Sequence, residues 1–188
     1  MKCGTKLTIQ SREELIDHIS HGNPVTYIFF WGHQKPKTGV SKSCFSQWYE
    51  SPFVDEQQTY LTAEHYMMAK KAELFSDNNA LKVVLASKTP NEAKKAGRGI
   101  LGFDEDKWLQ HRFEIVVSAN FAKFSQNPEL KEFLLNTGDS ILVEASPVDA
   151  IWGIGLTADD PAASEPHNWQ GQNLLGFALM RVRDQLKC

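Results

Sequence analysis

The chain has 188 residues, of which 41% are hydrophobic and 23% charged, so it is long and apolar enough for one globular domain. Its formal net charge of −3 argues against a general binder of phosphate backbones. No apolar run approaches the roughly 18 residues of a membrane span, and the 3 cysteines form no CxxC zinc motif. We expect a cytoplasmic protein without a cofactor.

The first third of the sequence predicts one short helix and one strand. Ser11-Arg12-Glu13-Glu14 is a capping box, so a helix begins there and turns Leu15 inward. Residues 25–31 are apolar, β-branched and aromatic, as in a strand, while residues 32–43 are typical of a loop. Residues 44–53 hold a second short strand or a turn. We divide the chain into an N-terminal extension (1–24) and a main domain (25–188).

From residue 62 onward the pattern is mainly helical. Caps, prolines and glycines predict helices at about 62–75, 77–86, 89–99, 104–124, 127–138 and 173–186. A buried strand is predicted at 141–144, and the loop at 147–171 is long enough to be functional. Strands and helices do not alternate regularly, which argues against a doubly wound fold. We therefore expect a single, mainly α domain of the α+β class with a small β component.

The segment Thr62-Ala63-Glu64-His65-Tyr66 places a carboxylate in the first turn of a helix. Thr62 is a good N-cap, and the unpaired N–H groups and the helix dipole there favour the charged form of Glu64. Lys71 lies two turns further on the same face, about 10 Å away, so the two charges could hold two ends of a charged substrate. The same pattern is also common in ordinary, well-capped helices.

Two further segments carry polar residues suited to a ligand, each with a structural alternative. Asp149 and Trp152 open the long loop beside two glycines, which permit close backbone approach. Asp149 could equally bond its own turn. Arg98, between Gly97 and Gly99, offers a planar fork to phosphate, or it complements the dipole at the end of its helix.

Aromatic and amide side chains add candidates for recognition of a base. Trp108 could stack on a base, although at helical spacing it more often fills the core. Asn173 could read a base or ribose edge, although capping the last helix is its commoner role. Trp31 and Trp48 with nearby lysines could line a nucleic-acid groove, but those lysines fit a solvated loop better. They are Lys35, Lys37 and Lys42.

Several separate motifs, in the right order, resemble the YbiA-like, or NADAR, family from about residue 29 to residue 186. They are Phe30-Trp31, Thr62-Ala63-Glu64-His65-Tyr66, Lys71, Gly97-Arg98, Trp108, Ala122-Lys123-Phe124, Val143-Glu144, Asp149-x-x-Trp152-Gly153-x-Gly155, Trp169-x-Gly171-x-Asn173-x-Leu175-Gly176 and Leu179-Met180-x-x-Arg183. One segment departs from the family. Many members carry Ser-Asn-Phe where this chain has Ser46-Gln47-Trp48, so its substrate contacts need not follow the family there.

The resemblance implies N-glycosidase chemistry, the hydrolysis of a bond between a ribose C1′ and a nitrogen. It places the family's catalytic glutamate at Glu64, its aspartate at Asp149 and its stacking tryptophan at Trp108. Two substrate classes are known in the family: ADP-ribose attached to guanine in nucleic acid, and phosphoribosylamino-pyrimidine intermediates of riboflavin biosynthesis. We expect the first class. The second class and a non-catalytic reader of ADP-ribose or NAD are the alternatives.

The expected mechanism follows from the positive charge that develops on C1′. We expect Glu64 to stay ionised and to face that carbon or the attacking water, while Asp149 binds ribose hydroxyls or assists the leaving base. A carboxylate can activate water unaided, so we expect no metal. The side chains expected to bind substrate are Trp31, Lys71, Arg98, Trp108, Trp152 and Asn173.

Overall fold

The computed structural model describes residues 9–187, and helices dominate this part of the chain. The helices are α1 (Arg12–Ser20), α2 (Ala63–Leu74), α3 (Asn78–Ala86), α4 (Pro90–Arg98), α5 (Glu105–Gln126), α6 (Pro128–Leu135) and α7 (Leu174–Lys187). The strands are β1 (Tyr27–Phe30), β2 (Phe53–Asp55), β3 (Gln58–Tyr60) and β4 (Ile141–Glu144). Three short 3₁₀ helices complete this part: η1 (Lys42–Phe45), η2 (Pro161–Ser164) and η3 (Pro166–Asn168). The predicted mainly helical α+β class is confirmed.

The helix starts follow the caps that the sequence displays. Thr89 Oγ1 accepts a 3.2 Å hydrogen bond from the amide of Glu92, whose carboxylate in turn accepts from the amide of Thr89 at 3.1 Å. Ser11 Oγ accepts from the amide of Glu14 at 3.1 Å in the same way. Because each cap satisfies an amide that the first turn leaves unpaired, such residues mark helix starts closely.

Strands β1 and β4 form a parallel pair although they lie far apart in the sequence. Their register runs from Tyr27 opposite Ile141 to Phe30 opposite Glu144. Both strands therefore end at the same edge, where Trp31 follows β1 and the chain leaves β4 after Glu144. In parallel sheets the carboxyl ends of the strands are a common place for ligand sites.

A second, antiparallel pair, β2 and β3, was not predicted from the sequence. The pair is joined by Glu56 and Gln57, which have φ of 47° and 68°. Positive φ in both central residues suits a tight hairpin turn, but the usual sequence signal is Asn-Gly or Asp-Gly. The segment at 44–53, expected to hold a strand or a turn, contains the end of η1 and reaches β2 only at Phe53.

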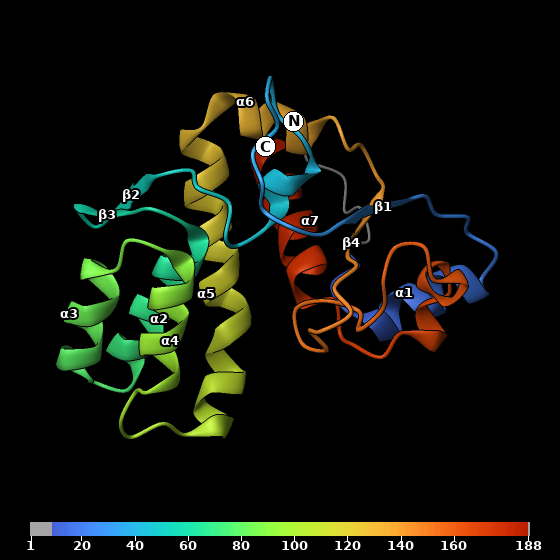
Figure 1. Cartoon of the computed structure of the whole chain (residues 1–188). Coiled ribbons are helices and arrows are strands. Elements are labelled where there is room, and N and C mark those ends of the chain that lie inside the picture. The colour runs from blue at the N-terminus through green and yellow to red at the C-terminus, as the bar shows by residue number, and fades with distance from the viewer. Residues whose placement is uncertain (1–8, 188) are drawn as a thin grey trace, which may run out of the picture.

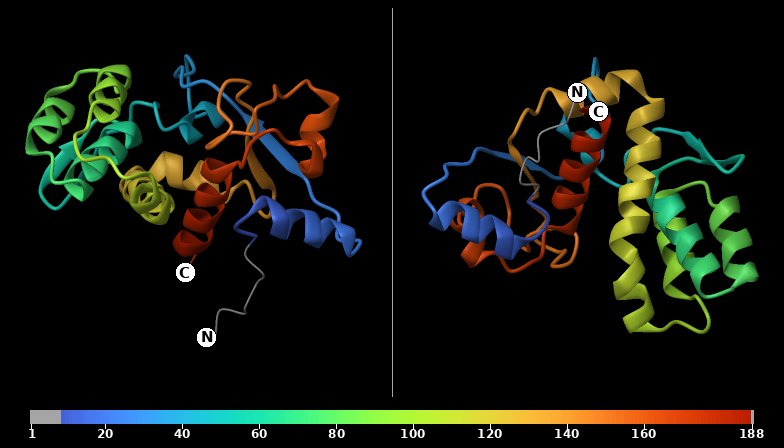
Figure 2. Two further views of the ribbon diagram at one scale, coloured as in Figure 1. Left: turned by 90° about the horizontal axis from the view of Figure 1, so that it is seen from below. Right: turned by 180° about the vertical axis from the view of Figure 1, so that it is seen from behind.

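Helix α5 runs through the middle of the molecule (Figure 1). Helices α2, α3 and α4 gather on one side of it, and α7 with β1 and β4 lies on the other, as the views from below and behind also show (Figure 2). Helix α1 packs on η3, where the Arg12 guanidinium donates to the carbonyls of Pro166 and His167 at 2.7 and 2.8 Å. The boundary between extension and domain stays a prediction.

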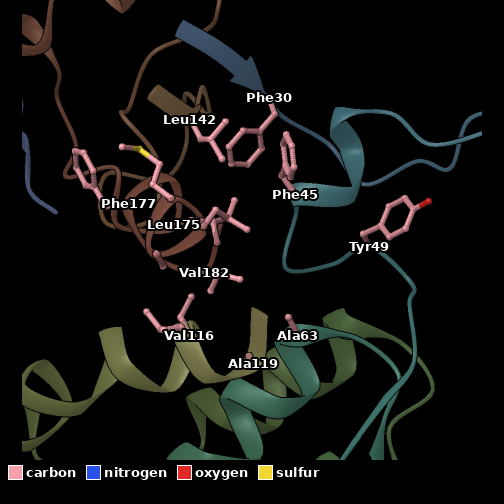
Figure 3. Close-up of a cluster of buried hydrophobic side chains, with 14 of the residues drawn as sticks. Phe30, Phe45, Tyr49, Ala63, Val116, Ala119, Leu142, Leu175, Phe177 and Val182 are labelled. Carbon is pink, nitrogen blue, oxygen red and sulfur yellow. The ribbon is translucent and has the colours of Figure 1, made fainter. Parts of the chain in front are cut away.

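The hydrophobic core joins the two sides of the molecule (Figure 3). Phe30 of β1 meets Phe45 of η1 edge to face, with ring centroids 5.4 Å apart. Side chains from β4, α5 and α7 complete the cluster: Leu142, Val116, Ala119, Leu175, Phe177 and Val182. Ala63 of α2 is fully buried in the same core and immediately precedes Glu64, so the core fixes that glutamate relative to both strands.

Among residues 9–187, no helix combines the length and apolarity needed to cross a bilayer. Cys44 is a buried free thiol, and the other two cysteines, Cys3 and Cys188, lie outside the described residues.

Candidate active site

A cavity of about 720 Å³ lies where the shared edge of β1 and β4 faces helices α2 and α4. Of the predicted site residues, all but Asn173 line it. Within residues 9–187 its charged lining consists of three carboxylates and three cations: Glu64, Glu144, Asp149, Lys71, Lys94 and Arg98. Four tryptophans add aromatic surface: Trp31, Trp48, Trp108 and Trp152.

Glu64 is held at the start of α2 by its backbone. Thr62 caps the helix, with Oγ1 accepting from the amide of His65 at 3.3 Å. The amide of Glu64 donates to the carbonyl of Gln47 at 3.0 Å, which joins the helix start to the loop after η1. The Glu64 residue is only 2% exposed, and its Oε1 has no hydrogen-bond partner among the described residues. The carboxylate therefore faces the cavity with one oxygen left for a ligand.

The protonation of Glu64 differs from the expectation. Burial raises the pKa of Glu64 to about 7, because desolvation outweighs the opposing effects of the Lys94 charge and a hydrogen bond from the Trp48 side chain. The negative charge of Asp149 raises this pKa further. The expectation of a permanently ionised Glu64 is therefore wrong, since desolvation exceeds what the helix N-terminus supplies. Near neutral pH both forms of Glu64 are populated.

Asp149 closes a local turn and also lies in the cavity wall, so the two alternatives that the sequence offered do not exclude each other. Asp149 Oδ1 accepts hydrogen bonds from the amides of Ile151 and Trp152, at 2.9 and 2.7 Å, so it closes a local turn. The same residue lines the cavity together with Glu64, and its negative charge contributes to the raised pKa of Glu64, whose main cause is burial. The turn fixes the carboxylate in place.

The cavity's cations come from α2 and α4. Lys71 Nζ donates to the carbonyl of Gly97 at 3.0 Å and lies 5.4 Å from the ring centre of Trp108. Burial lowers the pKa of Lys71, and the negative charge of Glu64 opposes that shift. Arg98 is the last residue of α4, so it lines the cavity and also stands where a cation complements the helix dipole.

The predicted aromatic residues differ in how far they are buried. Trp108 is half-buried, packs against the core and also lines the cavity. Trp31 is 59% exposed at the cavity mouth, where a large apolar side chain is available to a ligand. Trp152 is partly buried on the side of the long loop.

The prediction that the Asn173 side chain binds substrate is wrong. Asn173 is completely buried, with its Oδ1 accepting from the amide of Glu144 at 3.0 Å and its Nδ2 donating to the carbonyl of Leu142 at 2.9 Å. Its amide is thus occupied by the backbone of β4 and does not reach the cavity. Nor does the side chain cap α7. It joins the start of that helix to the strand.

Glu144 was not assigned to the site from the sequence. It is the last residue of β4 and lines the cavity, and its Oε2 is buried without a hydrogen-bond partner among the described residues. Burial raises the pKa of Glu144 to about 8, helped by the negative charges of Asp149 and Glu64 and opposed by Lys94. The sequence feature that could have indicated this position is an acidic residue directly after three apolar residues of a predicted buried strand.

The loop that carries Gln47 and Trp48 is anchored from beneath by Lys123. This lysine is fully buried in α5, and its Nζ donates to the carbonyls of Cys44 and Ser46 at 2.6 and 3.0 Å. Burial lowers the pKa of Lys123 to about 8. Its two bonds fix the backbone just before the residues that contact Glu64.

Comparison with known proteins identifies the family of the chain. The family model described as NADAR domain matches residues 29–187. The N-glycosidase R617 of Acanthamoeba polyphaga mimivirus is 43% identical over 164 residues, which cover 85% of this chain and 95% of the viral protein. The chloroplastic riboflavin biosynthesis protein PYRR of Zea mays is 34% identical over 135 residues, covering 68% of this chain and 20% of the maize protein.

Among solved structures, the NMR structure of the E. coli protein YbiA matches with a TM-score of 0.70 and 28% sequence identity, covering 86% of this chain and 85% of YbiA. The fold and the sequence thus point to the same group of proteins. The chain is a hydrolase that acts on N-glycosyl bonds, and it belongs to the NADAR domain family.

Proposed function

We propose that the chain releases ADP-ribose from modified guanine in nucleic acid, or cleaves a closely related nucleotide, at the bond between ribose C1′ and nitrogen. The observation that carries this proposal is the convergence of three carboxylates, three cations and four tryptophans on one cavity. Carboxylates suit a sugar carbon that becomes cationic, cations suit phosphate, and flat aromatic rings suit a base.

The individual roles follow from the position of each group. Glu64, in its ionised form, faces C1′ or takes a proton from the attacking water, since its Oε1 is buried and unpartnered among the described residues. Asp149 binds ribose hydroxyls from its fixed turn. Trp108 stacks on the base, and Lys71 and Arg98, which line the same cavity, hold phosphate.

A second cavity supports a substrate larger than one nucleotide. It measures about 700 Å³ and shares His33 and Trp48 with the first. The ring centroids of these two residues lie 5.5 Å apart, so the pair forms an aromatic wall that both cavities share. Lys35 in the second cavity is paired with Glu50 at 3.9 Å, which leaves Lys88 as the cation there that suits a further phosphate. ADP-ribose joined to guanine has an adenosine at one end and a guanine-bearing ribose at the other, so it can use both spaces.

The second candidate substrate is a phosphoribosylamino-pyrimidine of riboflavin biosynthesis. The similarity to the maize riboflavin protein favours it, and one nucleotide needs only the first cavity. The third interpretation from the sequence, a non-catalytic reader, is set aside because the chain is an N-glycosidase. A reader also has no need of several acids in one buried cavity. Both remaining candidates are nucleotide-type substrates, and neither involves a membrane.

A product assay on both substrates tests the proposal. The purified chain is incubated with a guanine-ADP-ribosylated DNA oligonucleotide and, separately, with the phosphoribosylamino-pyrimidine, and products are identified by mass spectrometry. We expect free ADP-ribose and unmodified DNA. Hydrolysis of the pyrimidine compound alone would assign the second candidate, and hydrolysis of neither would overturn both. Glu64→Gln, assayed beside the wild type, excludes a contaminating activity.

A further inference from the structure

We propose that Glu144 is the proton donor to the leaving nitrogen, and that the cavity therefore works with an acid on β4 and a base on α2. This inference rests on the proposed function, because it concerns how the same bond is cleaved. It adds a catalytic residue to the two carboxylates that the sequence pointed to.

The first argument is the position of Glu144. Its backbone is fixed on both sides: the amide donates to Asn173 Oδ1 at 3.0 Å, and the carbonyl accepts from the amide of Ile154 at 2.9 Å. The strand ends there, so the side chain enters the cavity from the sheet edge while Glu64 enters from α2. Two carboxyl groups that approach from different elements can act on opposite sides of one bond.

The second argument is the unpartnered oxygen. Glu144 Oε2 is buried and has no hydrogen-bond partner among the described residues. A buried polar atom without a protein partner destabilises the fold unless water, an ion, a ligand or a reaction uses it, and this oxygen belongs to a residue of the cavity wall, where a ligand can reach it. A protonated carboxyl offers an O–H donor, which a leaving nitrogen can accept.

The third argument is that the carboxyl groups of the cavity have different hydrogen bonds and neighbouring charges. Asp149 Oδ1 already accepts two amide hydrogen bonds, which suits a fixed acceptor rather than a proton donor. The charged groups that face Glu144 are Asp149 from the long loop, Lys94 from α4 and Glu64 from α2. Burial raises the pKa of Glu144 above its ordinary value, and the two negative charges raise it further, so a proton on Glu144 is favoured. Because both carboxyl groups line one cavity, one can hold a proton while the other is ionised.

The step balances with water as the only co-reactant. The C1′–N bond breaks and its electron pair stays on nitrogen, which takes the proton of Glu144. The oxygen of water bonds to C1′, and Glu64 takes the proton that water loses. The products are a ribose hydroxyl and an N–H group. Proton return from Glu64 to Glu144, directly or through solvent, restores the starting state.

The test compares leaving groups that need a proton with one that does not. Wild type, Glu144→Gln and Glu64→Gln are assayed on the N-linked substrate that the wild type cleaves and on p-nitrophenyl ribofuranoside 5′-phosphate, whose phenolate leaves unprotonated. Glu132→Gln, on the exposed side of α6, is the matched control. We expect Glu144→Gln to lose about 100-fold or more on the N-linked substrate and to stay within about threefold on the phenolate. Glu64→Gln loses activity on both.

The pH profile gives a second readout on the N-linked substrate. Wild-type kcat should fall above pH of about 8 as Glu144 ionises, and this alkaline limb should be missing from the residual activity of Glu144→Gln. Equal losses on both substrates, no loss on either, or an alkaline limb that survives in Glu144→Gln would each overturn the assignment. A wild type that cleaves no ribosyl–nitrogen bond would instead overturn the proposed function.

Discussion

Glu144 at the end of strand β4 has a pKa raised by burial, and the negative charge of Glu64 on helix α2 raises it further. The two residues lie far apart in sequence and line one cavity because the core holds α2 against the strand pair. Coupled carboxylates share protons, so their titration belongs to the pair. Such a pair supplies an acid and a base at the same pH, which is what hydrolysis of an N-glycosyl bond uses.

The coupled pair predicts a bell-shaped pH dependence. The pKa of Glu64 is raised to about 7, so its base form appears only as the pH rises through that value. The acid form of Glu144 disappears as the pH rises through about 8. We expect kcat/KM to peak between these values and to fall on either side. Initial rates measured from pH 5 to 10 in buffers of constant ionic strength check this, and a flat profile below pH 7 would contradict it.

Trp48 should tune the acid side of that profile. Its side chain donates a hydrogen bond to the Glu64 carboxylate and so lowers the pKa of Glu64. In Trp48→Phe the donor is lost, the pKa rises further, and the acid limb should move to higher pH by about 0.5–1 unit. Phe is also the residue that many family members carry here. Trp31→Phe, at the more exposed tryptophan of the cavity mouth, is the control and should leave the limb in place.

Removing the charge of Glu64 should stabilise the fold at alkaline pH. The folded-state pKa of about 7 lies above the ordinary value of 4.5, so the folded chain holds a proton that the unfolded chain releases between these values. Stability therefore falls as pH rises through that window, and the full penalty is present above pH 7. We expect Glu64→Gln to raise the free energy of unfolding at pH 8 by about 1–3 kcal/mol.

Urea denaturation at two pH values measures that effect. Near pH 4 both wild-type states are protonated, and the difference from Glu64→Gln should shrink towards zero. Glu132→Gln should change stability little at either pH. A Glu64→Gln variant that is less stable than wild type at pH 8 would contradict the raised pKa of Glu64 in the folded chain.

Asn173 should matter for stability rather than for substrate binding. Asn173→Ala leaves the amide of Glu144 and the carbonyl of Leu142 without their partners. We expect a loss of about 2–4 kcal/mol in the free energy of unfolding, with KM close to wild type. Gln185→Ala, at an exposed amide of the same helix α7, is the control. A large rise in KM with unchanged stability would restore Asn173 to the substrate site.

The sequence predicted helices well because their signals are local. Ser11, Thr62 and Thr89 each bond an amide three residues on, so the cap and the helix that it starts are neighbours in the chain. The β2–β3 hairpin escaped prediction because Glu56 and Gln57 adopt positive φ without the glycine that usually marks such a turn.

The site was predictable only in part because it depends on contacts between distant segments. Glu64, Trp108 and Asp149 were identified through motif resemblance, and the structure brings them to one cavity. The burial of these two carboxyl groups depends on contacts between distant segments, so the raised pKa of Glu64 and the place of Glu144 in the cavity wall were both missed. Asn173 was misassigned because a polar residue in a motif can serve the backbone as well as a ligand.

The most direct test of this account is the single-turnover rate of C1′–N cleavage by Glu64→Gln, measured with substrate affinity in the same preparation. We predict a rate lower by about 100-fold or more, with Kd within about threefold of wild type, because the lost charge acts mainly on the transition state. Glu132→Gln should match wild type in both quantities. A folded Glu64→Gln variant that cleaves at nearly the wild-type rate would contradict the central claim.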